Sequence, residues 1–163
     1  MKNHLTNLFE FVNSISSSFL TSKYNPDFST WSSIRSSIEE VERAFAIEEF
    51  KMDAVVVSEG LKAKLPSKLT ADNFYRLSKE GELLGYAFID QAPSKTASFD
   101  YLVVFDVDLK VKHSKVLIYR EEYGGEIGSK RWLKQFLGKT GGDRVDYETN
   151  IDGIAGATIS VRS

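Results

Sequence analysis

The sequence contains no cysteine and only two histidines among its 163 residues. The absence of cysteine excludes a disulfide framework, a thiolate metal site and a cysteine nucleophile. His4 and His113 lie far apart in the chain, and neither has a carboxylate at a metal-ligand spacing. We therefore expect no metal site and expect both histidines at the surface.

Charge of one sign and long apolar runs are also missing. The formal net charge is -2, and such a balanced chain gives no electrostatic argument for nucleic acid or for an anionic membrane as a partner. No apolar run reaches the length of a transmembrane helix. Residues 1–20 make a poor signal peptide, because Glu10 and Asn13 interrupt their apolar stretch. We expect no nucleic-acid partner and no transmembrane segment in this chain.

The motifs of self-sufficient enzymes are absent as well. The chain has neither a Gly-x-Ser-x-Gly elbow nor a phosphate-binding glycine loop that ends in Lys-Ser or Lys-Thr. Asp100, Asp106 and Asp108 lack the glycine and the terminal glutamate of a calcium loop, which favours a turn between strands. A self-contained hydrolase or kinase is therefore not expected.

What is present indicates one globular domain of ordinary core size, with 42% apolar and 27% charged residues. Apolar residues at helical spacing predict one helix within residues 5–19 and another within residues 31–45. An Asn-Pro-Asp sequence predicts a connector over residues 22–29. We therefore divide the chain into an N-terminal helix with its connector, residues 1–30, and a main domain, residues 31–163.

From residue 50 onward the pattern changes from helical to strand-like. It predicts a short β-like run over residues 54–57 and four strands over residues 73–78, 82–90, 99–106 and 109–120. Their connections, such as Glu80-Gly81, are too short for parallel crossovers, which predicts an antiparallel meander. Residues 125–138 predict a further helix that ends at Gly138. The expected fold class is α+β, a twisted antiparallel sheet with packed helices.

The most informative pattern lies at the end of the chain. Asp152 and three further residues are followed by Gly156, Ala157 and Thr158. Glycine permits the close approach of a bulky group, alanine adds only a methyl group, and threonine supplies a hydroxyl that can be esterified. A helix opening after Thr158 would offer free N–H groups to a phosphate. On the motif alone, a small-residue turn before a helix is an equally good interpretation.

This pattern resembles the flavinylation motif of FMN-binding domains, including the G subunit of Rnf complexes and the C subunit of the sodium-translocating NADH:quinone oxidoreductase. In that family the threonine of Gly-Ala-Thr carries FMN through a phosphoester bond, which implies attachment at Thr158 here. The resemblance also implies that Asp152 is read by a Mg-dependent flavin transferase that uses FAD as donor. It further implies an electron carrier with a redox partner protein, in the periplasm or elsewhere in the cell envelope.

A second segment, residues 120–128, is similar to the family's His-x-Glu-Thr-Pro-Gly-Leu-Gly turn. Glu122 matches the family glutamate and Gly125 its first glycine, while Tyr123 and Gly124 replace threonine and proline. The two glycines could form a side-chain-free wall for the flavin ring, and Tyr123 could contact its other face. Glu122 could bond polar atoms of the flavin or could be solvated.

Aromatic contact with the ring could also come from Trp132 or Tyr101, although core packing is the better interpretation of Trp132. The expected flavin-binding residues are Asp152, Gly156, Ala157, Thr158, Glu122, Tyr123 and Gly125. The alternative function is a non-redox binding or structural module of the cell envelope that keeps the same fold. Ala155, where the family has serine or threonine, favours that alternative. We also expect that the helix after Thr158 is cut short in this chain.

Overall fold

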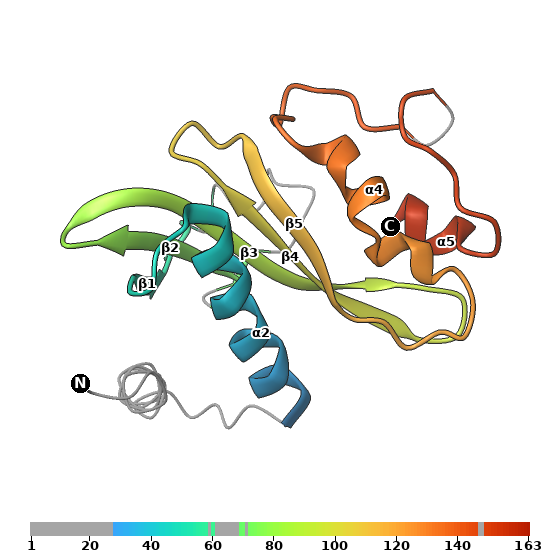
Figure 1. Cartoon of the computed structure of the whole chain (residues 1–163), viewed down its shortest axis with the longest axis horizontal. Coiled ribbons are helices and arrows are strands. Elements are labelled where there is room, and N and C mark those ends of the chain that lie inside the picture. The colour runs from blue at the N-terminus through green and yellow to red at the C-terminus, as the bar shows by residue number, and fades with distance from the viewer. Residues whose placement is uncertain (1–27, 59, 61–68, 71, 147–148) are drawn as a thin grey trace. The chain divides into compact units, whose positions relative to one another are not determined.

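A five-stranded antiparallel sheet, with its strands in chain order, is the framework of the described part of the chain (Figure 1). The strands are β1 (Lys51–Ala54), β2 (Phe74–Lys79), β3 (Glu82–Pro93), β4 (Ser98–Phe105) and β5 (Val111–Ile118). The predicted α+β class and the antiparallel meander are confirmed.

The computed structural model describes residues 28–58, 60, 69–70, 72–146 and 149–163. The chain divides into two units, Met1–Ser32 and Ser33–Ser163. The helix predicted within residues 5–19 and most of the predicted connector lie outside the described residues. The boundary expected at residue 30 stays a prediction.

Strand β1 begins before the apolar run, residues 54–57, from which a strand was predicted. β1 ends at Ala54, and beyond it the Val55 N–H donates to the Phe74 carbonyl at 2.9 Å. Val56 is 88% exposed. The prediction of a strand over residues 54–57 was therefore wrong in its bounds, because pairing with β2 rather than apolar character determines where this strand lies.

The turns between strands follow their sequence signals. Glu80 and Gly81 both have positive φ angles, 51° and 87°, as a two-residue hairpin that matches the strand twist requires. The Asp106 carboxylate accepts hydrogen bonds from the N–H groups of Asp108 at 2.9 Å and Lys110 at 3.0 Å. This confirms that Asp106 belongs to a strand turn.

The helices are α2 (Phe28–Phe45), the 3-10 helix η1 (Gly125–Gly128), α4 (Lys130–Leu133), the 3-10 helix η2 (Lys134–Phe136) and α5 (Thr158–Arg162). The single helix predicted over residues 125–138 was wrong. Ser129 has an extended backbone, and its side chain caps α4 by accepting from the Trp132 N–H at 3.2 Å. No helix within the described residues is both long and apolar enough to span a bilayer.

The two faces of β4 carry different layers. Side chains alternate along a strand, and Asp100 accepts a hydrogen bond from Ser33 Oγ of α2 at 2.7 Å. Asp100 and the fully buried Leu102 therefore face α2, while Phe99 faces the opposite side. On that side it joins a buried cluster with Ala92, Ile127, Trp132 and Ile151. Figure 1 shows α4 and α5 lying together beside β5, where this cluster is found.

Two buried carboxylates attach α2 to the sheet. Asp100, 3% exposed, accepts from Arg120 Nη1 at 2.8 Å and Nη2 at 3.1 Å, and from Gln91 Nε2 at 3.0 Å. Burial alone would raise the pKa of Asp100, but the hydrogen bonds from Arg120 and Ser33 outweigh it and lower the pKa below the ordinary value. The ionised form of Asp100 is therefore the one that stabilises the fold.

Glu40 of α2 forms the second attachment. It lies 2.9 Å from His113 Nε2 and 3.5 Å from Lys115 Nζ, and it accepts from Arg43 at 2.6 Å. Burial would raise the pKa of Glu40, but the bond with His113 and the nearby positive charges lower it. The His113 side chain is 30% exposed, so it reaches the surface while bonding to Glu40. His4, the other histidine expected at the surface, lies outside the described residues.

Replacing Asp100 by asparagine should cost about 3 kcal/mol of folding free energy, because Arg120 then lies beside an uncharged group. Since the folded-state pKa of Asp100 is lowered, the unaltered chain should lose this contribution as the pH falls through that pKa. Thermal unfolding from about pH 7 to about pH 2 measures both effects. The control is Glu39→Gln, a change at a carboxylate whose side chain is 52% exposed. Equal unfolding temperatures for the two variants would contradict the assigned role.

Candidate functional site

The glycine turn and the C-terminal motif lie in contact with each other. Gly124 is buried, and a Cβ atom added to it would overlap the Cβ of Ala157 and lie 3.1 Å from Tyr119 Oη. Tyr119 Oη donates a hydrogen bond to the Tyr123 carbonyl at 3.0 Å. A Cβ added to Gly156 would lie 3.7 Å from Tyr123 Cβ. Two segments that the sequence indicates separately therefore form one site.

Within the C-terminal motif, the residues that pack on the rest of the domain are buried, and the residues that could contact a cofactor are exposed. Ile151 and Ala157 are only 5% and 3% exposed. The exposed residues are Asp152, Gly153, Ala155, Gly156 and Thr158. Thr158 is the first residue of α5, whereas the second hydroxyl, on Ser160, is 5% exposed. The accessible hydroxyl of this segment is therefore that of Thr158.

The main chain of Asp152 is held by side chains from α4 and η2. Its N–H donates to Gln135 Oε1 at 2.8 Å, and its carbonyl accepts from Trp132 Nε1 at 2.7 Å. Trp132 and Gln135 lie far from Asp152 in the sequence, and no local pattern in the chain marks Gln135 as part of the site. The exposed carboxylate of Asp152 is thus carried by a fixed backbone.

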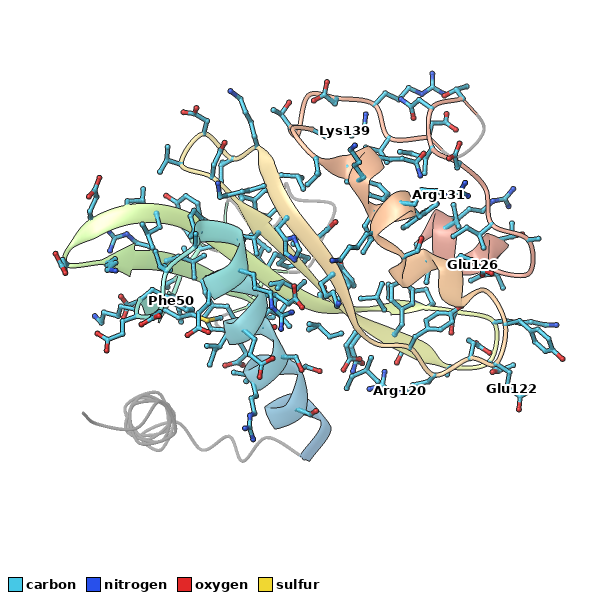
Figure 2. The ribbon with its side chains drawn as sticks, viewed as in Figure 1. Phe50, Arg120, Glu122, Glu126, Arg131 and Lys139 are labelled. Atoms are coloured by element: carbon cyan, nitrogen blue, oxygen red, sulfur yellow. The ribbon has the colours of Figure 1, made fainter. Side chains whose placement is uncertain are left out.

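The outer side of the glycine turn is open. Tyr123 is 75% exposed, and Glu122 is exposed and points away from the ribbon (Figure 2). A Cβ added to Gly125 would meet nothing within 4 Å, whereas the left-handed residue of the turn is Gly124, with a φ of 79°. Gly125 therefore leaves the surface beside the turn open. Gly124 supplies the left-handed backbone conformation of the turn and allows its close approach to Ala157.

Glu121, which no sequence motif marks, connects the glycine turn to the turn between β3 and β4 through hydrogen bonds. Its carboxylate accepts from Ser94 Oγ at 2.6 Å, from the Thr96 N–H at 2.6 Å and from Thr96 Oγ1 at 2.7 Å. The hydrogen bonds from Ser94 and Thr96 lower the pKa of Glu121 to about 2. It is therefore a structural carboxylate, distinct from its exposed neighbour Glu122.

A cavity of about 870 Å³ lies between the sheet and the helices α4 and α5, within the roughly 300–1,000 Å³ of small-molecule sites. Its lining includes Phe99, Tyr101, Trp132, Phe136, Ser160 and Val161. Ser114 Oγ, also in the lining, is buried without a hydrogen-bond partner among the described residues. Burial, assisted by Asp90, raises the pKa of Tyr101 to about 12. Trp132 is part of the core, as expected, and borders this cavity as well.

The region that contains β4, β5, the glycine turn and the motif matches a known family. Residues 97–163 match the family model of the FMN-binding domain. This segment belongs to the FMN-binding domain family. FMN is accordingly the cofactor of the domain. A comparison with curated proteins finds no match.

The residues of the FMN-binding domain fit this cofactor. Thr158 is an exposed residue, and Cβ atoms added to Gly125 or Gly153 would meet nothing within 4 Å. The cavity adds aromatic side chains and the Ser114 hydroxyl, which has no hydrogen-bond partner within the described part of the chain. The domain thus offers both bare backbone and aromatic surface, which are the two kinds of contact that a flat flavin ring requires.

Proposed function

We propose that this domain carries FMN covalently on Thr158 and acts as an electron carrier rather than as a self-contained enzyme. The observation that carries the proposal is that Thr158 is an exposed residue at the start of α5 and directly follows Ala157, which packs on Gly124. The neighbouring hydroxyl of Ser160 is buried, which supports Thr158 as the attachment point.

The attachment step requires a flavin transferase and FAD as co-reactant. Thr158 Oγ bonds to the phosphorus of the FMN half of FAD while the pyrophosphate P–O bond breaks. AMP leaves, and the hydroxyl proton passes to a base of the transferase. Asp152, exposed on the same loop, is the residue that the transferase recognises, because the exposed glycines beside it leave its carboxylate accessible.

Bound FMN supplies the redox chemistry, and this chain supplies its position and surroundings. Gly156 and Ala157 precede the attachment point, and Gly156 lies beside Tyr123, while Gly125 and Glu122 are exposed on the same glycine turn. In this proposal these five residues contact the flavin. A redox partner protein exchanges electrons with the flavin. We place the domain, residues 31–163, in the periplasm or elsewhere in the cell envelope.

Co-expression with a flavin transferase should give a yellow protein whose colour survives denaturation, because a phosphoester bond does not depend on the fold. After acid precipitation, the flavin fluorescence should remain with the protein pellet. A matched preparation made without the transferase should release its flavin into the supernatant. Complete release from both preparations would contradict covalent attachment.

The alternative is a non-redox binding module, and the cavity is the observation that favours it. The cavity is largely apolar, and the buried Ser114 hydroxyl in its lining has no hydrogen-bond partner among the residues that the structure describes. Such a cavity is suited to a small aromatic ligand without any covalent bond. The two functions differ in two measurable respects. A binding module would hold no flavin after denaturation and would show no flavin redox signal in the native state.

A further inference from the structure

Three hydrogen bonds form a closed set around the main chain of Asp152. The Asp152 N–H donates to Gln135 Oε1 at 2.8 Å, and its carbonyl accepts from Trp132 Nε1 at 2.7 Å. The Gln135 amide is itself held, because its Nε2 donates to the Trp132 carbonyl at 3.0 Å. Trp132 is 8% exposed and packs edge-to-face on Phe136, with 5.0 Å between ring centroids. The side chains of Trp132 and Gln135, which both bond to the Asp152 main chain, are therefore held in place themselves.

The same loop is also fixed on either side of Asp152. Ile151 lies in the buried cluster with Trp132, and Ala157 packs on Gly124 at the far end of the motif. Asp152 lies between these anchors and Thr158 directly follows the second one, and both residues are exposed. The backbone contacts thus determine where the two exposed groups stand relative to each other.

We infer that Gln135, acting with Trp132, is a positioning residue for flavin attachment, which orders the loop before the transferase binds. The inference rests on the proposed function. Gln135 acts through the backbone of Asp152, since its amide is occupied by main-chain groups. A loop that is already ordered loses less conformational entropy on binding, so the transferase recognises it with higher affinity.

The test variant is Gln135→Leu, which removes both hydrogen bonds of the amide at similar side-chain size. The transferase KM for this variant should rise about tenfold with kcat unchanged, because binding rather than the chemical step carries the ordering cost. The matched control is Lys134→Leu, on the exposed neighbour in the same turn, which should leave KM unchanged.

A second readout needs no flavin. In the unmodified chain, hydrogen exchange of the Asp152 amide should be about tenfold faster in Gln135→Leu than in the control, because its acceptor is gone. The Leu133 amide, which donates to the Ser129 carbonyl at 3.0 Å, reports on α4 itself and should be unaffected. Gln135→Glu keeps an acceptor for the Asp152 N–H and should retain most of its protection.

The outcomes separate the possible failures. The inference is overturned if Gln135→Leu speeds hydrogen exchange of the Asp152 amide but leaves the transferase KM unchanged. It is equally overturned if KM rises while the Asp152 amide stays protected from exchange. It is also overturned if hydrogen exchange of the Asp152 amide is as fast in Gln135→Glu as in Gln135→Leu. Faster exchange of the Leu133 amide together with that of Asp152 would overturn it too, since α4 would then have unfolded. An unaltered chain that an active transferase leaves unmodified contradicts the proposed function instead.

Discussion

Replacing Gly124 by alanine is expected to destabilise the domain by about 2–5 kcal/mol. Gly124 has a φ of 79°, and an L-residue in that conformation costs about 1–2 kcal/mol. The added Cβ would also overlap Ala157 Cβ and lie 3.2 Å from Ala157 Cα, and such overpacking adds about 1–3 kcal/mol. Thermal unfolding should show a midpoint about 5–15 °C lower for a domain of this size.

Two further variants isolate the causes of this loss. Gly125→Ala is the control, because its Cβ would meet nothing within 4 Å, and it should change stability by less than about 0.5 kcal/mol. The double variant Gly124→Ala/Ala157→Gly removes the overlapping methyl group but keeps the unfavourable φ, so it should recover only part of the loss. If Gly124→Ala were as stable as Gly125→Ala, the turn and the motif would not be packed together as described.

The sheet and α2 could be predicted from the sequence, because alternation and helical spacing are local signals. The bounds of β1 (Lys51–Ala54) could not be predicted, since its apolar continuation, Val56, is 88% exposed. The break between η1 and α4 was missed for a related reason. Helical spacing continues through Ser129, but its extended backbone and its capping side chain end one segment and begin the next.

The candidate site can be proposed from the sequence where it depends on a short motif, but not where it depends on distant contacts. The pattern of Asp152 and Thr158 is readable in the chain, and Thr158 is exposed as an attachment point must be. The packing of Gly124 on Ala157 and the hydrogen bond from Asp152 to Gln135 join residues far apart in sequence. No local pattern reports such contacts, because they exist only once the helices pack on the sheet.

Thr158→Ala should abolish the flavin adduct completely, because it removes the accessible hydroxyl of the segment. Ser160→Ala should leave the adduct intact, since Ser160 is 5% exposed and lies beyond the reach of a transferase acting on the folded domain. Intact mass after co-expression with a flavin transferase measures both results. Thr158 is exposed, so its replacement should change stability by less than about 0.5 kcal/mol, and thermal unfolding checks that the variant is folded.

Localisation of the adduct by tandem mass spectrometry of the C-terminal peptide tests the central claim most directly. In the unaltered chain, the mass of FMN minus one water should appear on the fragments that contain Thr158 and be absent from fragments that contain only Ser160 and the residues after it. An adduct on Ser160, or an unmodified peptide from a preparation in which the transferase modifies another substrate, would contradict the assignment of Thr158 as the flavin attachment point.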